Sequence, residues 1–225
     1  RRGLWARVHN AAVHPRGRAP GGHPAGPPVR AGRPELAAAE EALASRGHAV
    51  LDGVLSSGAL RGLRLLLRDS SIYYYPKHGG SYLLALLEDG LAQPLLAEVV
   101  ESLRAALPDA LGPHALCEAR AWKADNSGLP GLPAVPPSPG LEPGGAEVGV
   151  LLWTTPRRAL ASQAAAAPLS LPRADGTAAP VAYAANRLVL WRDNCPAAAP
   201  RWHGLRFRGG FEHRGVHLVL RFGGG

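Results

Sequence analysis

Apolar residues recur at helical spacing over residues 93–107, which is the most regularly patterned part of the chain. Glu98, Glu101 and Arg104 take the opposite side of the same segment. Spacings of three and four residues predict an amphipathic helix with one buried face, which Pro108 ends. The apolar positions of this helix are Leu95, Leu96, Val99, Val100, Leu103 and Leu107.

Two shorter helices are predicted before it. Pro34 in a first turn and Gly47 after a last turn indicate a helix over residues 34–46. A short strand at residues 48–52 follows. Ser56 or Ser57 can then cap a helix that runs to about residue 68.

The second half of the chain changes to short β-type segments separated by glycine and proline. Residues 72–75 are aromatic and β-prone, and we expect Pro76 to stop that strand. Residues 157–180 are rich in Ala, Pro and Ser, and we expect a long insertion or flexible loop there. The remaining predicted strands are residues 115–124, 148–153, 187–191 and 216–222. Helices first and strands later favour a mostly β, α+β fold, a sandwich or barrel buttressed by N-terminal helices.

Composition is that of a soluble domain with a substantial core. The chain has 225 residues, of which 46% are hydrophobic. It has no apolar run of the roughly 18 residues that a membrane helix needs, and its first residues lead into no signal-peptide core. Because it has no Met, we expect it to be part of a longer protein or a processed product. Two cysteines, Cys117 and Cys195, form no metal or disulfide pattern and do not indicate a compartment.

Positive charge is concentrated at the N-terminus. Residues 1–33 hold seven arginines and no acidic residue. The rest of the chain has the other 18 of the 25 basic residues and all 17 acidic residues. Its net charge is therefore about +1, out of +8 for the whole chain. Without periodicity, residues 1–33 are predicted to be a disordered arm in front of a single domain at residues 34–225. The composition of a GC-rich genome is the favoured explanation of the arginines. A nucleic-acid-binding arm is the alternative, but the segment lacks the interleaved aromatics that such an arm would have.

Several segments, in order, resemble the Fe(II)/2-oxoglutarate-dependent oxygenases, and most closely a prolyl-hydroxylase-like branch that is often attached to tetratricopeptide repeats. These segments are residues 47–60 (GHAVLDGVLSSGAL), 73–82 (YYYPKHGGSY), 122–125 (WKAD), 152–156 (LWTTP), 186–191 (NRLVLW) and 211–223 (FEHRGVHLVLRFG). The resemblance implies a double-stranded β-helix, or jelly roll, with the active site inside its open end. It also implies hydroxylation of an unactivated C–H bond with Fe(II) and 2-oxoglutarate.

The resemblance fails where iron should bind. Such sites use two His nitrogens and one carboxylate oxygen, and the family supplies two of them as His-x-Asp. No histidine of this chain has Asp two residues later. The expected positions fall on Val135 and Pro137, or on Glu142 and Gly144, depending on the direction of counting. Residues 129–145 contain six prolines, which disfavour a central strand, and Glu142 is the one ligand-type side chain at these positions.

The remaining functional positions are predicted near the C-terminus. The distal histidine falls on Ala197, or on His203 if a gap is moved, and His203 is the candidate metal ligand. Arg214 is the candidate partner for 2-oxoglutarate, although Gly215 stands where the family usually has a second Arg. Alternate strand residues share a face. If Gly215 faces into the barrel, Arg214 faces out and Arg221 or His217 becomes the nearest internal cation.

The sequence therefore predicts an oxygenase-type domain whose catalysis is impaired, with catalytic residues undefined. The alternative is a non-catalytic binding or scaffold domain that keeps the fold. A third interpretation is a translated sequence damaged in its proline-rich middle. If the domain is active, its partners are 2-oxoglutarate and a substrate that the sequence does not specify; no membrane contact and no nucleic acid is expected.

Overall fold

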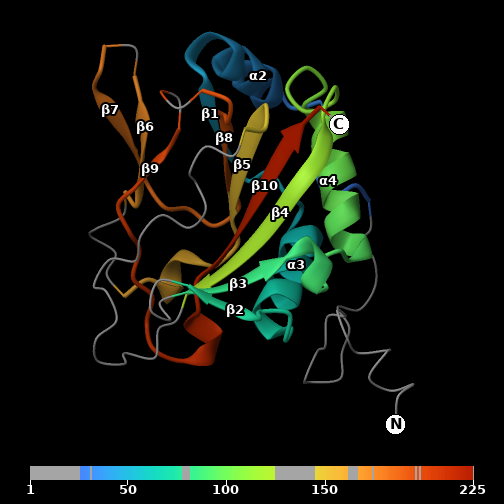
Figure 1. Cartoon of the computed structure of the whole chain (residues 1–225), viewed down its shortest axis with the longest axis vertical. Coiled ribbons are helices and arrows are strands. Elements are labelled where there is room, and N and C mark those ends of the chain that lie inside the picture. The colour runs from blue at the N-terminus through green and yellow to red at the C-terminus, as the bar shows by residue number, and fades with distance from the viewer. Residues whose placement is uncertain are drawn as a thin grey trace.

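The protein is described by a computed structural model in which two antiparallel β-sheets pack face to face (Figure 1). The larger sheet has seven strands in the order β1-β8-β5-β10-β4-β3-β2, and the smaller has the order β7-β6-β9. The structure describes residues 26–30, 32–77, 82–124, 145–161, 167–173, 175–195, 197 and 199–224. This is the predicted double-stranded β-helix.

In the larger sheet, the bounds of β1, β4, β5, β8 and β10 agree closely with the sequence pattern, whereas those of β2 and β3 do not. Its strands are β1 His48–Asp52, β2 Tyr75–Lys77, β3 Tyr82–Leu86, β4 Ala115–Ala124, β5 Val148–Trp153, β8 Arg187–Arg192 and β10 Val216–Gly223. The smaller sheet consists of β6 Leu169–Pro172, β7 Ala178–Val181 and β9 Arg201–Trp202.

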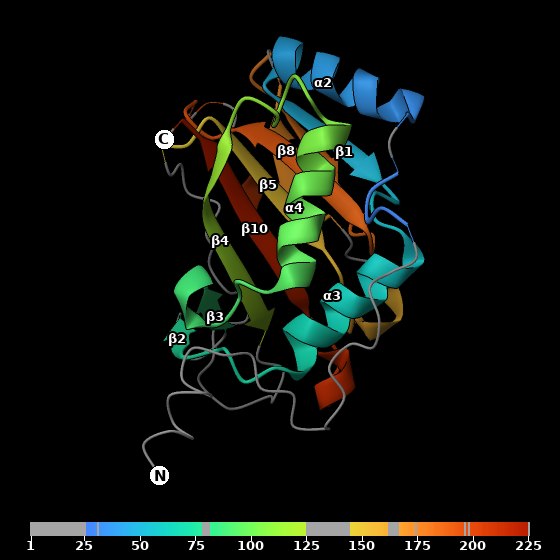
Figure 2. The same cartoon turned by 90° about the vertical axis from the view of Figure 1, so that its right-hand side faces the viewer.

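Three helices cover the outer face of the larger sheet (Figure 2). They are α2 Pro34–Arg46, α3 Ser57–Asp69 and α4 Pro94–Ala106. Each begins and ends as the sequence predicts. Ser56 Oγ accepts a hydrogen bond from Ala59 N at 3.3 Å, and Gly47 ends α2 with φ 76°. The buried face of α4 is formed by Leu96, Val99, Val100, Leu103 and Ala106. Within the described residues, the helices are too short or too polar to cross a membrane.

The larger sheet separates two hydrophobic clusters, and each residue of its strands faces one or the other. On β10, Val216, Leu218, Leu220 and Phe222 belong to the cluster under the helices. The intervening Val219 belongs to the cluster between the two sheets. Because strand residues alternate, His217 and Arg221 point with Val219 into the barrel.

Two parts of the sequence prediction are wrong. Residues 157–180 are not a structureless insertion, because they contain β6 and most of β7. Pro76 does not stop a strand, because Tyr75–Lys77 continues through it. This strand lies at the edge of the sheet, where a residue without an N–H costs no ladder hydrogen bond. The strand β3 was also not predicted.

The packed structure begins before residue 34, where the sequence placed the domain boundary. Val29 is 2% exposed, bridges Leu55, and donates its N–H to Ser102 Oγ at 3.0 Å. Pro28 O accepts a hydrogen bond from Ser56 N at 2.7 Å. Residues 1–25 of the predicted arm lie outside the described residues.

Candidate functional site

Aromatic side chains from both sheets meet in the hydrophobic cluster between them. Trp153 on β5 packs on Tyr183 with ring centroids 5.0 Å apart, and Phe207 meets Tyr183 edge-on at 6.1 Å. Trp202 of β9 reaches His217 of β10 at 5.8 Å. Tyr82 of β3 meets the same imidazole at 6.0 Å. Trp202 and His217 thus bring the two sheets into contact.

His217 is held as a neutral imidazole in this aromatic surrounding. His217 is 3% exposed, and its Nε2 atom has no hydrogen-bond partner among the described residues. Burial lowers the pKa of His217 to about 3, because an uncompensated charge is costly in a nonpolar environment. His217 therefore lies in the barrel, as the alternation predicted, but it carries no positive charge at neutral pH.

Arg221 lies farther along the same face and has its charge compensated by two carboxylates. Its Nε lies 3.1 Å from Asp193 Oδ2. This contact is an ion pair and does not have the geometry of a hydrogen bond. Its Nη1 donates to Glu118 Oε2, and Glu118 also binds Arg120. Asp193 is 1% exposed and also accepts a hydrogen bond from Trp191 Nε1 at 3.0 Å. Two guanidinium groups and two carboxylates balance one another here.

Bulky rings stand directly over two glycines of the barrel wall. A Cβ added to Gly215 would lie 1.9 Å from the Phe207 ring, and one added to Gly149 would lie 2.2 Å from the Trp191 ring. Gly215 therefore faces into the barrel, which was the condition set in the sequence analysis. The space that a larger side chain would take at this position is filled by Phe207.

Arg214 points the other way, as that condition implies. Its guanidinium lies 5.7 Å from the Phe211 ring. Its charge is the second cause, after burial, that lowers the pKa of Lys123 to about 8. The ammonium of Lys123 donates to Arg68 O at 2.8 Å and lies 3.9 Å from the Tyr73 ring centroid. Arg214 thus belongs to the helix side of the sheet.

His203 follows β9 and is exposed. Its Nε2 lies 2.7 Å from Ser170 Oγ of β6, and its backbone N donates to Pro168 O at 2.7 Å. The preceding Trp202 takes the inward position, so alternation directs His203 outward. The assignment of His203 as a metal ligand stays a prediction.

The described residues do not fit an iron centre of the expected kind. Within them, no three His, Cys, Asp or Glu side chains are grouped so that they could hold a metal ion. The expected His-x-Asp positions, Glu142 among them, lie outside the described residues. Ala197, the other aligned position for the distal ligand, has no donor atom in its side chain.

Asp193 and Glu118 are the polar barrel residues that sequence reasoning missed. Only Asp193 carried a signal in the sequence. Asp193 follows Trp191 at a spacing of two, and so shares its face at the end of β8. Glu118 is the register partner of Arg221 on β4, which becomes visible only when the strand pairing is known.

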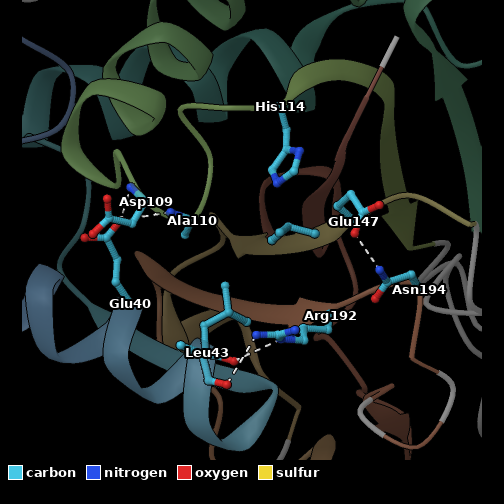
Figure 3. Close-up of a pocket in the computed structure, with 10 residues that line it drawn as sticks. Glu40, Leu43, Asp109, Ala110, His114, Glu147, Arg192 and Asn194 are labelled. Carbon is cyan, nitrogen blue, oxygen red and sulfur yellow. Dashed lines mark hydrogen bonds between the residues drawn. The ribbon is translucent and has the colours of Figure 1, made fainter.

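A pocket of about 200 Å³ lies outside the barrel, between α2, the turn after α4 and the ends of β5 and β8 (Figure 3). Its polar groups largely satisfy one another. Glu40 Oε1 accepts from the backbone N–H groups of Asp109 and Ala110, and Arg192 donates to the last carbonyls of α2, Leu43 O and Ala44 O. The bonds of Glu40 attach α2 to the turn after α4, and those of Arg192 attach it to β8. The polar groups of this pocket therefore have a structural role.

Comparisons with known proteins agree with this architecture. No protein-family model matches the chain, and no curated protein matches it. A Pseudomonas putida prolyl-4-hydroxylase superimposes with a TM-score of 0.53 at 15% identity, covering 84% of this chain and 99% of that one. A 2OG-Fe(II) oxygenase from Burkholderia pseudomallei gives 0.57 at 10% identity, with coverage of 88% and 95%. The chain has the fold of the 2-oxoglutarate oxygenases.

A third similar structure shows what this fold can hold elsewhere. HygX from Streptomyces hygroscopicus, with nickel, 2-oxoglutarate and hygromycin B bound, gives a TM-score of 0.53 at 15% identity. It covers 86% of this chain and 87% of that one. At such identities the likeness establishes the fold and leaves the chemistry to the residues of this chain.

Proposed function

We propose that this domain is of the hydroxylase type of Fe(II)/2-oxoglutarate oxygenases and that its catalysis is impaired. The observation that carries the proposal is the compensated charge of Arg221. An internal cation would have to pair with a cosubstrate carboxylate, but Arg221 is already bound by Asp193 and Glu118. A dicarboxylate would have to displace either Glu118 or Asp193, and Asp193 is a buried carboxylate that would then lose its cationic partner, which is strongly unfavourable.

A second function, a non-catalytic binding or scaffold domain, is favoured by the aromatic filling. Phe207 over Gly215 and Trp191 over Gly149 occupy space inside the barrel. Such packing contributes to stability whether or not a ligand is bound. In this alternative the fold is retained for its surface, and any link to tetratricopeptide repeats or another partner stays a prediction.

Anaerobic titration with Fe(II), with and without 2-oxoglutarate, tests the proposal. We expect no saturable binding at micromolar Fe(II), because a missing carboxylate and imidazole each remove a ligand together with its supporting hydrogen bonds. We also expect 2-oxoglutarate to leave the melting temperature unchanged. Binding would be easy to detect, because a ligand at a concentration of 100 times its Kd stabilises a protein by about 2.7 kcal/mol.

His203→Ala and Arg214→Ala are the informative variants. Both should behave as the wild type in the titration and the melt. Stoichiometric Fe(II) binding that disappears in His203→Ala, or cosubstrate stabilisation that disappears in Arg214→Ala, would show an intact site and refute the impairment.

A further inference from the structure

A second pocket, of about 240 Å³, lies between α3 and the segments that follow β5 and precede β8. Its apolar wall is formed by Leu60 and Leu65 of the helix and by Pro156 and Ala185 of two loops. Three arginines of α3, at positions 61, 64 and 68, line its rim. Positions separated by three, four and seven residues lie on one side of a helix, so the guanidinium groups share one edge of the pocket.

In the part of the chain that the structure describes, the positive charge on this rim is only partly balanced. Arg68 is paired with Asp69 through Nε at 2.6 Å. Within the described residues, Arg61 and Arg64 have no ion pair, and Arg64 makes one hydrogen bond, a 3.4 Å contact with the carbonyl of Glu212. Burial, and after it the charges of Arg68 and Arg158, lower the pKa of Arg64. The charge of Glu212 also acts on Arg68. Arginines therefore outnumber the carboxylates Asp69 and Glu212 beside this apolar surface.

We propose that this pocket binds a small amphiphilic anion, with an oxyanion head on Arg61 and Arg64 and an apolar body against Leu60, Leu65 and Pro156. A guanidinium group forms paired hydrogen bonds with carboxylate or phosphate oxygens. The pocket is smaller than the usual range for drug-sized ligands, roughly 300–1,000 Å³. A body of medium-chain length therefore fits it better than a large ring system. Charge and shape together exclude a cationic ligand of the same length.

Titration of the full chain with octanoate and with octyl phosphate, followed by NMR, tests the proposal. We expect saturable shifts of backbone amides in α3 and around Pro156 with at least one of the two heads. The tighter head identifies the oxyanion. Octylamine has the same chain with the opposite charge and acetate has the charge without the chain, so both should bind at least about tenfold more weakly.

Arg64→Gln and Arg61→Gln are each expected to weaken octanoate binding by about tenfold, as removal of a charge-assisted hydrogen bond does. Arg61 is exposed, so its variant decides the question if Arg64→Gln unfolds. Arg201→Gln, at an exposed position on β9, is the matched control and should bind as the wild type. Equal binding of octylamine, no saturation by either anion at millimolar concentration, or equal loss in Arg201→Gln would overturn the proposal.

Discussion

At the scale of single residues, His217 gives the clearest dependence of stability on pH. Its pKa in the fold is about 3, whereas a histidine of an unfolded chain titrates near about 6.5. Between these values the unfolded state binds a proton that the folded state excludes. The contribution of His217 is therefore complete above about pH 6.5 and is lost as the pH falls, by about 1.4 kcal/mol per pH unit.

His217→Phe should reduce this loss, because a ring of similar size then replaces a titrating group. The measurement is the free energy of unfolding in urea at several values between about pH 7 and about pH 4. Burial and Arg46 also lower the pKa of His48, so part of the acid loss should remain. His203→Gln, at an exposed position, should keep the wild-type slope. An unchanged slope in His217→Phe would contradict the prediction.

Gly215 and Phe207 form a pair that a double-mutant cycle can test. Gly215→Ala should destabilise the protein by about 1–3 kcal/mol, because its Cβ would lie 1.9 Å from the Phe207 ring. In a Phe207→Ala background the same substitution should cost much less, since the obstructing ring is absent. Denaturant melts of the four proteins give the coupling energy. Additive costs would mean that Phe207 does not occupy the space over Gly215.

Alternation on β10 was predictable from the sequence, but the partners of its residues were not. The spacing correctly placed His217 and Arg221 on one face and Arg214 on the other. It did not indicate that Asp193, which follows β8, would pair with Arg221, or that Phe207, which lies in a loop, would cover Gly215. Contacts between segments far apart in the chain depend on strand order, which a single sequence does not contain.

At the scale of elements, the accuracy of prediction followed the length of the pattern. The helix α4 was recognised because its apolar period extends over several turns. The strands β6 and β7 have four residues each, and only Leu169 and Leu171 of β6 show the alternation. Such strands are stabilised by pairing with each other and by burial against the larger sheet. That information is tertiary, and it was therefore missed.

The same helix supplies a prediction about stability. Leu103→Ala should cost about 2–5 kcal/mol, because Leu103 is fully buried between α4 and the sheet. Leu95→Ala, on the same helix, removes a side chain that is only partly buried and should cost clearly less. Urea denaturation of the two variants provides the comparison. Equal losses of stability in the two variants would mean that α4 does not turn Leu103 toward the sheet.

At the scale of the whole molecule, the predicted fold is confirmed, whereas the metal and cosubstrate residues stay a prediction. The order of helices and strands, together with the family-like segments, indicated a double-stranded β-helix. The expected His-x-Asp positions fall within residues 129–145, where counting from the two sides gives different residues, and the distal histidine depends on the gap before His203. Neither question is resolved by periodicity, because proline-rich segments and loops have none.

The N-terminal boundary is the last point at which sequence and structure differ, and it leads to a prediction for the whole chain. Deletion of residues 1–33 would remove buried Val29, its hydrogen bond to Ser102 Oγ, and the bond from Ser56 N to Pro28 O. Truncating a buried aliphatic side chain alone costs about 1–3 kcal/mol of burial, which for a domain of this size lowers the melting temperature by several degrees.

Deletion of residues 1–25 keeps all of these contacts and is the matched control. We expect it to leave the melting temperature close to that of the full chain, because its arginine- and proline-rich composition has no apolar period to bury. Differential scanning calorimetry of the three chains measures both effects. If the shorter deletion is as destabilising as the longer one, residues before Gly26 contribute to the fold and the domain begins earlier still.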